Sequence, residues 1–164
     1  MPTVQVRRAG ADDAPAISAV LRAAFAEFEP LYTTGGFNAT TPSGDQVARR
    51  IEEGLAWVAR DGDAVVGTVA AVLRDDGLYV RSMGVLPATR TRGVARQLFA
   101  RVEQFAEDHG CARLYLSTTP FLAHAIRLYE HLGFHHTDDP PHDLHGTPLL
   151  TMVKRMTTDR PSAP

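Results

Sequence analysis

The spacing of apolar residues changes in the middle of the chain, from the period of a strand to the period of a helix. Between Gly77 and Val85, successive side chains alternate with a period of two residues, which predicts a β-strand. From Val94 onward the apolar residues recur at helical spacing and share one face, which predicts an amphipathic helix. Gly110 suits the residue that follows the end of such a helix.

The residues before this segment predict a first strand, two helices and two more strands. Asp12 or Asp13 is expected at the N-cap of the first helix, with Pro15 in its first turn. Ser43 and Gln46 have the spacing of a capping box, which predicts the start of the second helix. The segments are as follows: strand Thr3 to Arg7, an amphipathic helix to Phe28, a loop from Glu29 to Pro42, a helix carrying Val47, Ile51 and Leu55, and strands Trp57 to Arg60 and Ala64 to Leu73.

The residues after the long helix predict a strand, a fourth helix and two final strands. Thr119 and Pro120 are expected as the cap and first turn of the next helix, which Gly133 ends. The segments are strand Arg113 to Thr118, helix Phe121 to Leu132, a short strand Phe134 to Thr137, a loop from Asp138 to Pro148, and strand Leu149 to Met156.

This order of elements predicts an α+β fold with a mixed, mostly antiparallel sheet. Strands joined by short turns pair antiparallel, whereas a strand–helix–strand crossover gives a parallel pair. We therefore expect roughly six to seven strands with helices on both faces. Residues 1–156 are predicted to form one domain, and residues 157–164 a disordered tail.

Composition narrows the class of protein further. The chain has 164 residues, a formal net charge of −2 and one cysteine, so a general nucleic-acid-binding surface and an internal disulfide are not expected. No apolar run approaches the ~20 residues of a membrane-spanning helix. The cytoplasm is the expected compartment, without a membrane or nucleic-acid partner.

The loop between the central strand and the long helix is basic. Arg90, Arg92 and Arg96 lie around the helix start, and no acid occupies its first turn. Positive side chains are unfavourable at a helix N-terminus, because the helix dipole is positive at that end. An anion such as phosphate, bound at this position, would make the arrangement favourable. Gly93 would let the backbone approach that anion closely. The alternative is a loop with surplus surface arginines.

The segment Arg90–Ala95, in this context, resembles the Arg/Gln-x-x-Gly-x-Gly/Ala signature of the GNAT superfamily of N-acetyltransferases. The element order resembles that family from about Thr3 to Arg155. The resemblance implies acetyl-CoA as co-substrate, with its pyrophosphate on the basic loop and its pantetheine arm on a strand edge that a neighbouring strand leaves unpaired. The implied cofactor contacts are Met83, Gly84, Val85, Arg90, Thr91, Arg92, Gly93, Val94, Ala95 and Arg96.

Tyr129 is the catalytic residue that the resemblance implies. Ala125 to Tyr129, followed by Gly133 and Phe134, matches the family pattern in which a tyrosine protonates the departing thiolate. A tyrosine has an ordinary pKa of ~10 and a thiol ~8.5, so the transfer is uphill by only ~2 kcal/mol. The alternative is a core tyrosine. Leu122 stands where many members have an asparagine that helps to hold the cofactor.

The acceptor side of the site is less well defined by the sequence. Phe28, Tyr32 and Tyr79 are candidate acceptor contacts, although each also suits simple packing, and no general base is assigned. The histidines and aspartates between His135 and His145 do not have the spacing of zinc ligands, so no metal is expected.

The predicted function is therefore transfer of an acetyl group to a primary amine by direct attack in a ternary complex. The amine belongs to a small molecule or a protein. One alternative is a non-catalytic domain that binds acyl-CoA as a sensor or scaffold. Another, a nucleotide-phosphate-binding protein, is disfavoured because the chain lacks Gly-Lys-Ser/Thr. A homodimer remains open.

Overall fold

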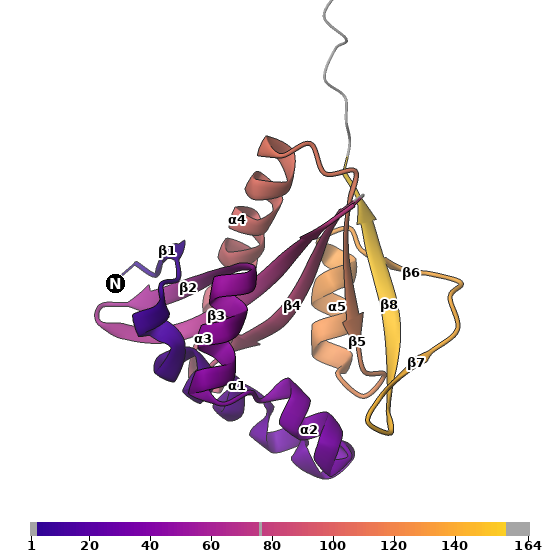
Figure 1. Cartoon of the computed structure of the whole chain (residues 1–164), viewed down its shortest axis with the longest axis horizontal. Coiled ribbons are helices and arrows are strands. Elements are labelled where there is room, and N and C mark those ends of the chain that lie inside the picture. The colour runs from indigo at the N-terminus through magenta and orange to yellow at the C-terminus, as the bar shows by residue number, and fades with distance from the viewer. Residues whose placement is uncertain (1–2, 76, 157–164) are drawn as a thin grey trace, which may run out of the picture.

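A computed structural model describes residues 3–75 and 77–156, so the predicted tail at 157–164 lies outside the described residues. Eight strands form one sheet in the order β1-β2-β3-β4-β5-β8-β6, with β7 paired to β8 (Figure 1). All neighbours pair antiparallel except β4 and β5, which are parallel. The strands are β1 Gln5–Arg8, β2 Leu55–Asp61, β3 Ala64–Arg74, β4 Gly77–Val85, β5 Arg113–Thr118, β6 His135–His136, β7 His142–Leu144 and β8 Thr147–Arg155. The mixed α+β class is confirmed, and β6 lies within the expected short strand, so only the unexpected β7 brings the strand number above the expected range.

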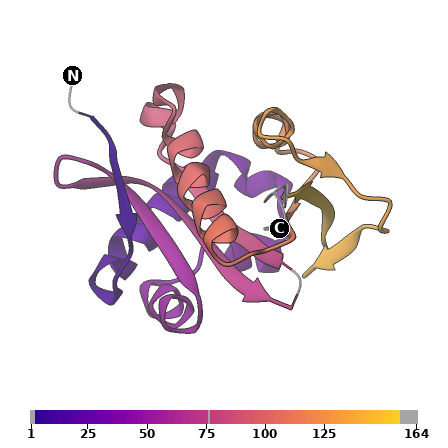
Figure 2. The same ribbon diagram turned by 90° about the horizontal axis from the view of Figure 1, so that it is seen from above.

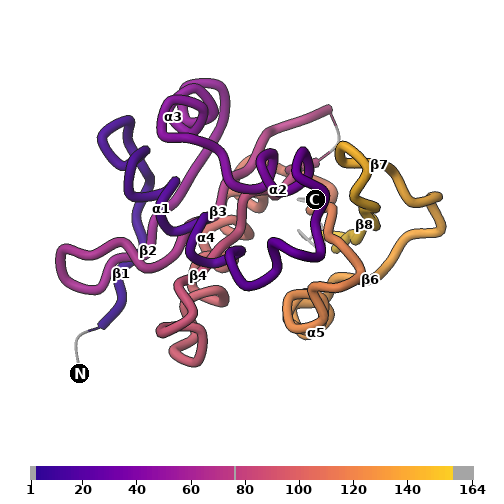
Figure 3. Tube along the Cα trace, turned by 90° about the horizontal axis from the view of Figure 1, so that it is seen from below, coloured from indigo at the N-terminus to yellow at the C-terminus, as the bar shows by residue number. Residues whose placement is uncertain are grey.

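Helices cover both faces of the sheet, as Figures 2 and 3 show from above and below. On one face, α4 (Val94–Asp108) and α5 (Ala123–His131) cover the larger core, which includes Leu98, Phe99 and Leu114. On the other face, α1 (Ala14–Phe25) and α3 (Gly44–Glu53) cover a smaller core. The remaining helices are the 3-10 turns η1 Ala11–Asp13, η2 Ala26–Leu31 and η3 Pro87–Arg92, and the short α2 Thr34–Thr40.

Two strand glycines let helices approach the sheet closely. A Cβ on Gly67 would lie 2.8 Å from Val94 Cγ1 of α4, and a Cβ on Gly84 would lie 3.0 Å from Leu21 Cδ2 of α1. Real Cβ atoms almost never approach another carbon within 3.0 Å. The absence of a side chain at these positions therefore fixes the separation of α4 and α1 from the middle of the sheet.

The parallel pair of β4 and β5 is short. Its register runs only from Gly77 opposite Arg113 to Val80 opposite Leu116. Both strands continue beyond these residues, and Figure 1 shows them starting together and then diverging. The sheet therefore opens into a V in its middle.

Several local predictions are confirmed. Ser43 and Gln46 form the capping box that starts α3. Gly110 has φ 65° just beyond the end of α4. Residues 113–118 form a strand with the predicted bounds.

Other predictions were wrong. The expected loop from Glu29 to Pro42 contains the end of η2 and the whole of α2, because contacts with distant residues stabilise a glycine-rich helix there. Leu55 starts β2 instead of continuing a helix. Thr119 does not cap α5, which begins four residues later. The expected loop before β8 contains β7, because it folds back on β8 as a hairpin.

Contacts with the β7–β8 turn hold α2 in place. Thr33 caps α2 by accepting a hydrogen bond from the Gly36 amide, and its own hydroxyl donates to the His145 carbonyl at 2.7 Å. Its amide donates to Thr147 Oγ1 at 3.0 Å. A Cβ on Gly36 would lie 2.3 Å from that same oxygen. The segment between α1 and α3 is thereby attached to the far half of the sheet.

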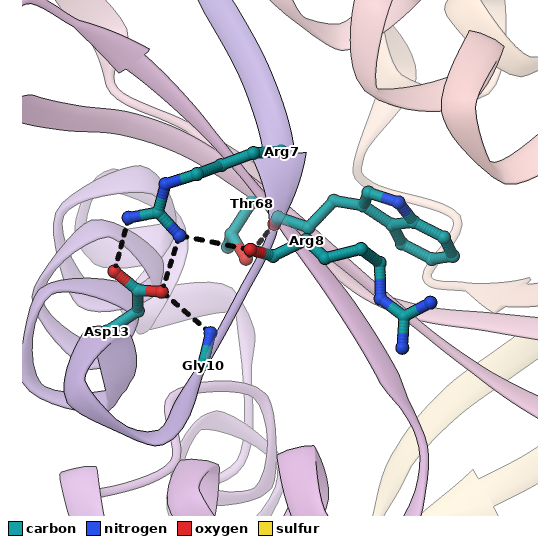
Figure 4. Close-up of polar contacts among 6 residues, drawn as sticks. Arg7, Arg8, Gly10, Asp13 and Thr68 are labelled. Carbon is teal, nitrogen blue, oxygen red and sulfur yellow. Dashed lines mark hydrogen bonds and ion pairs between the residues drawn. The ribbon is translucent and has the colours of Figure 1, made fainter.

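An ion pair connects the first strand to the start of α1 (Figure 4). Both oxygens of the Asp13 carboxylate accept hydrogen bonds from Arg7, at 2.8 and 2.9 Å. The Gly10 amide donates a third at 2.8 Å. Hydrogen bonding from Arg7 is the main reason that the pKa of Asp13 lies below its ordinary value, although partial burial opposes this change.

We expect Asp13→Asn to lower the free energy of unfolding by about 1 kcal/mol at pH 7, because a charge-assisted pair whose arginine is partly exposed contributes on that scale. The folded-state pKa is lowered, so this stabilisation is present above the unfolded pKa of ~3.9 and disappears as the pH falls through the folded value. Urea unfolding at pH 7 and pH 3 measures both effects. Asp12→Asn is the matched control, and an equal loss in both variants would contradict the assignment.

Candidate active site

The open V between β4 and β5 exposes main-chain groups in the middle of the sheet. From Arg81 to Val85, β4 pairs with β3 on one side and has no strand partner toward β5. Ser117 and Thr118 pair only with β8. Unpaired backbone N–H and C=O groups need another partner. The V therefore offers an extended ligand a strand edge that contains Met83 and Val85, the two residues predicted to bind by their main chain.

A β-bulge lies at the point where the V opens. The register of β3 with β4 shifts between Thr68 and Ala70, which leaves one extra residue in β4. Ser82 has φ 54°, a left-handed conformation that is uncommon for a residue other than glycine. Bulges of this kind change the direction of side chains and backbone groups and are over-represented beside active sites.

The N-terminus of α4 has the properties of an anion site. Gly93 precedes the helix with φ 73°, no side chain caps it, and its first turn contains no acid. The first helical hydrogen bond runs from the Gln97 amide to the Gly93 carbonyl. The amides of Val94, Ala95 and Arg96 therefore lack intrahelical acceptors. A Cβ on Gly93 would meet no other atom of the chain within 4 Å, so contacts within the protein do not require glycine here. The left-handed backbone conformation favours glycine at this position, in addition to the close approach of an anion.

Two of the three arginines at this site are paired with carboxylates. Arg90 forms an ion pair with Glu27 and donates to the Ala24 carbonyl at 2.7 Å. Arg92 lies 2.8 Å from Asp61 Oδ2. Arg96 is exposed on the first turn of α4. Arg90 therefore also connects η3 to the end of α1, and of these three arginines only Arg96 has no ion pair with the described residues.

Tyr129 lies on the buried face of α5. Its ring packs edge-on against Phe99 and Phe134, at centroid distances of 5.8 and 6.0 Å. Burial raises the pKa of Tyr129 well above its ordinary value, and the nearby phenol of Tyr32 adds to the rise. The hydroxyl group therefore stays protonated across the neutral and mildly alkaline range.

Tyr32 and Thr119 belong to the same neighbourhood as Tyr129. The Tyr32 ring meets Phe121 edge-on at 4.8 Å. Burial raises the pKa of Tyr32, although the hydroxyls of Thr119 and Thr40 oppose the rise. The Thr119 hydroxyl is buried, and apart from this interaction with Tyr32 it has no hydrogen-bond partner among the described residues. A buried polar group of this kind indicates a place for an unseen polar partner.

The other predicted residues lie elsewhere. Phe28 is half-buried in η2. Tyr79 lies in the paired part of β4, where its ring contacts Tyr115 at 5.1 Å and Arg74 at 4.7 Å. His142 contacts Ser117 Oγ at 3.1 Å. Within residues 3–75 and 77–156, no group of three metal-binding side chains is present.

Sequence reasoning missed Thr119, Arg50 and Ser82. Thr119 was predicted to be a helix cap, because threonine is common at caps and nothing in the local sequence indicates that its hydroxyl is buried. Arg50 occupies the last turn of a polar helix, where an arginine is ordinary. Ser82 continues the alternating strand pattern, and a bulge leaves no local signal in such a pattern.

Comparison with known proteins agrees with this geometry. The model of the Acetyltransferase (GNAT) family matches residues 18–134. The uncharacterized N-acetyltransferase YjgM of Escherichia coli K12 is 37% identical over 139 residues, which are 81% of this chain and 83% of that protein. Rat N-acetylaspartate synthetase is 34% identical over 102 residues, 61% of this chain and 34% of the relative's length.

The fold is shared with solved acetyltransferases. The PaiA N-acetyltransferase of Thermoplasma acidophilum, crystallised with coenzyme A, superposes with a TM-score of 0.81 at 13% identity, covering 94% of this chain and 99% of that one. The chain therefore belongs to the GNAT acetyltransferase family, and this membership supports acyl transfer from coenzyme A as its class of reaction. No helix in the described ranges is long and apolar enough to cross a membrane.

We expect Arg96→Glu to weaken coenzyme A binding at least tenfold without changing the melting temperature, because Arg96 faces solvent and the substitution places a carboxylate beside the expected phosphate site. Isothermal titration calorimetry with coenzyme A measures the affinity. Arg155→Glu is the matched control for the reversal of charge. Arg155 is the last residue of β8 and pairs with Arg113, the first residue of β5. Equal affinity of the Arg96 variant and the unmutated protein would remove Arg96 from the site.

Proposed function

We propose that the protein transfers the acetyl group of acetyl-CoA to a primary amine by direct attack in a ternary complex. The single observation that supports this most is the unpaired β4 edge, which continues through η3 into the uncapped N-terminus of α4. One continuous segment thereby offers amide-binding and phosphate-binding groups in sequence. An extended ligand with amides at one end and phosphates at the other matches that order.

The residues of this chain fit coenzyme A on physical grounds. Amides of a pantetheine arm are donors and acceptors like those of a strand, so the edge at Met83 and Val85 suits them. The free amides of Val94 and Ala95, together with Arg96, suit the pyrophosphate. The buried Thr119 hydroxyl, directly after the end of β5, is a further donor or acceptor for the arm.

The transfer forms a C–N bond between the amine and the acetyl carbon and breaks the C–S bond of the thioester. The amine loses a proton, and the sulfur leaves as a thiolate that gains one. Main-chain N–H groups of β4 beside the bulge stabilise the negative charge that develops on the thioester oxygen. No covalent enzyme intermediate is needed, and buried Cys111, after the end of α4, takes no part.

Tyr129 is proposed as the group that protonates the thiolate. Its raised pKa makes the isolated phenol a weaker acid than an ordinary tyrosine. Desolvation in the same apolar surroundings also raises the pKa of the leaving thiol, so the difference between the two groups need not widen. Tyr129 therefore acts by donating a hydrogen bond that becomes a proton transfer as charge develops on sulfur.

The acceptor is proposed to be the amine of a small molecule or a protein, which binds on the side of the sheet covered by α1 and α3. The name of the rat relative indicates that an amino acid, aspartate, is the amine acceptor of that protein. The similarity supports an amino acid as one class of acceptor for this chain. A cytoplasmic location and a homodimer stay predictions.

A non-catalytic acyl-CoA-binding domain is the second candidate, and the Tyr129 hydroxyl distinguishes the two. We expect Tyr129→Phe to lower kcat about 100-fold, within the range typical of a lost general acid, while the affinity for acetyl-CoA changes less than threefold. The phenylalanine keeps the ring contacts with Phe99 and Phe134. Release of free thiol from acetyl-CoA, followed with a panel of amines, measures turnover.

Tyr115→Phe is the matched control, since this tyrosine lies in the paired part of β5 and should retain full activity. Unchanged turnover in Tyr129→Phe would remove Tyr129 from the mechanism. Failure of the unmutated protein to bind acetyl-CoA in calorimetry would overturn the whole proposal.

A further inference from the structure

The bulge in β4 brings two consecutive side chains to the same face of the sheet. In a regular strand, Arg81 and Ser82 would point to opposite faces. Ala70 and Ser82 both line a small cavity beneath α1 and α3. Arg81 is paired with Ala70 across the β3–β4 ladder and therefore points to the same face. The extra residue and the left-handed φ at Ser82 account for this arrangement.

Arg50 of α3 reaches the same place. Its Nη1 donates to Ser82 Oγ at 3.1 Å. Burial lowers the pKa of Arg50, and the positive charge of Arg81 lowers it further, so the two guanidinium groups lie within electrostatic reach of each other. Within the described part of the chain, neither arginine has a carboxylate partner, and Arg81 Nε is buried without any hydrogen bond. Two half-buried cations without an anion are unfavourable.

An open hollow leads from the surface to Arg50. It has a volume of about 600 Å³ and lies between α1, α2, the start of α3 and the β7–β8 turn, within the range of small-molecule sites. Arg50 lines both the hollow and the small cavity of about 20 Å³ beneath it. The described residues that line the hollow include Arg22 and His145 and no acid.

We propose that Arg50 and Arg81 bind a carboxylate of the acceptor, so that the substrate is an amine bearing an acidic group, such as an amino acid. This inference rests on the proposed function. Planar guanidinium groups bind carboxylates through paired hydrogen bonds, and Arg81 Nε supplies a donor that lacks a partner. A carboxylate there also neutralises the two adjacent positive charges.

The position of the pair limits the distance between the carboxylate and the amine. Arg50 Nη1 contacts Ser82 Oγ at 3.1 Å, and Ser82 is adjacent to Met83, so the anion site lies beside the main chain that is expected to hold the thioester. An acceptor whose carboxylate and amine are separated by few atoms, as in an amino acid, suits this position. A polyamine, by contrast, would bring more positive charge to a site that already has an excess.

The test compares acceptors that differ only in the carboxylate. L-Aspartate, L-methionine and L-phenylalanine are each paired with their α-carboxamide, and kcat/KM is measured by thiol release from acetyl-CoA. We expect at least one acid to exceed its amide by 30-fold or more. The amine of an amino-acid amide loses its proton more easily than the amine of the corresponding acid. A difference in amine basicity alone would therefore make the amides react faster than the acids.

Variants then assign the preference to the two arginines. We expect Arg50→Gln and Arg81→Gln each to lower kcat/KM for the preferred acid at least tenfold, with less than threefold change for its amide and for acetyl-CoA affinity. Arg50→Lys should restore part of the loss. Arg49→Gln, which alters the exposed neighbour on α3, is the matched control and should behave as the unmutated protein.

The outcomes separate this inference from the proposed function. Absence of acetyl-CoA binding overturns the proposed function. With acetyl-CoA binding intact, three results overturn the carboxylate site alone: amides that react as fast as acids, variants that slow both equally, and no reaction with any acid of the panel.

Discussion

The hydrogen-bonding requirement of the β4 main chain is the constraint on which this molecule depends. A strand in the middle of a sheet normally has partners on both sides, and an edge that lacks them needs water or a ligand. Here β4 and β5 separate after Val80 opposite Leu116. The fold tolerates this opening because each half is held independently, β4 by β3 and β5 by β8. The ligand-binding edge is thus a consequence of how the two halves pair.

The elements around the V are held by contacts that also serve the site. Gly84 lets α1 lie close to β4, and Arg90 connects the end of α1 to η3 through Glu27 and the Ala24 carbonyl. Thr33 attaches α2 to the β7–β8 turn across the open end of the V. The basic loop is therefore less charged toward solvent than its arginines imply. Its capacity for anions comes chiefly from the free amides of α4 and from Arg96.

Much of the fold could be predicted because its signals are local. The alternation in β4, the helical period from Val94 and the capping box at Ser43 depend on neighbours a few residues apart, and the structure contains all three. Predictions failed where distant contacts decide. The helix α2 is glycine-rich and depends on Thr147, more than a hundred residues away. Thr119 has the local pattern of a cap but is buried among side chains from other segments.

The order of elements, the uncapped basic start of α4 and the tyrosine of α5 could all be recognised in the sequence, because periodicity, charge and motif spacing are properties of short segments. Three features could be seen only in the folded chain: the point where β4 leaves β5, the bulge that turns Arg81 and Ser82 to one face, and the approach of Arg50 from α3. These features depend on strand register and on electrostatic contact between segments that are remote in the chain. No local pattern of residues encodes them, since an arginine on a helix looks the same in the sequence whether it faces solvent or another arginine.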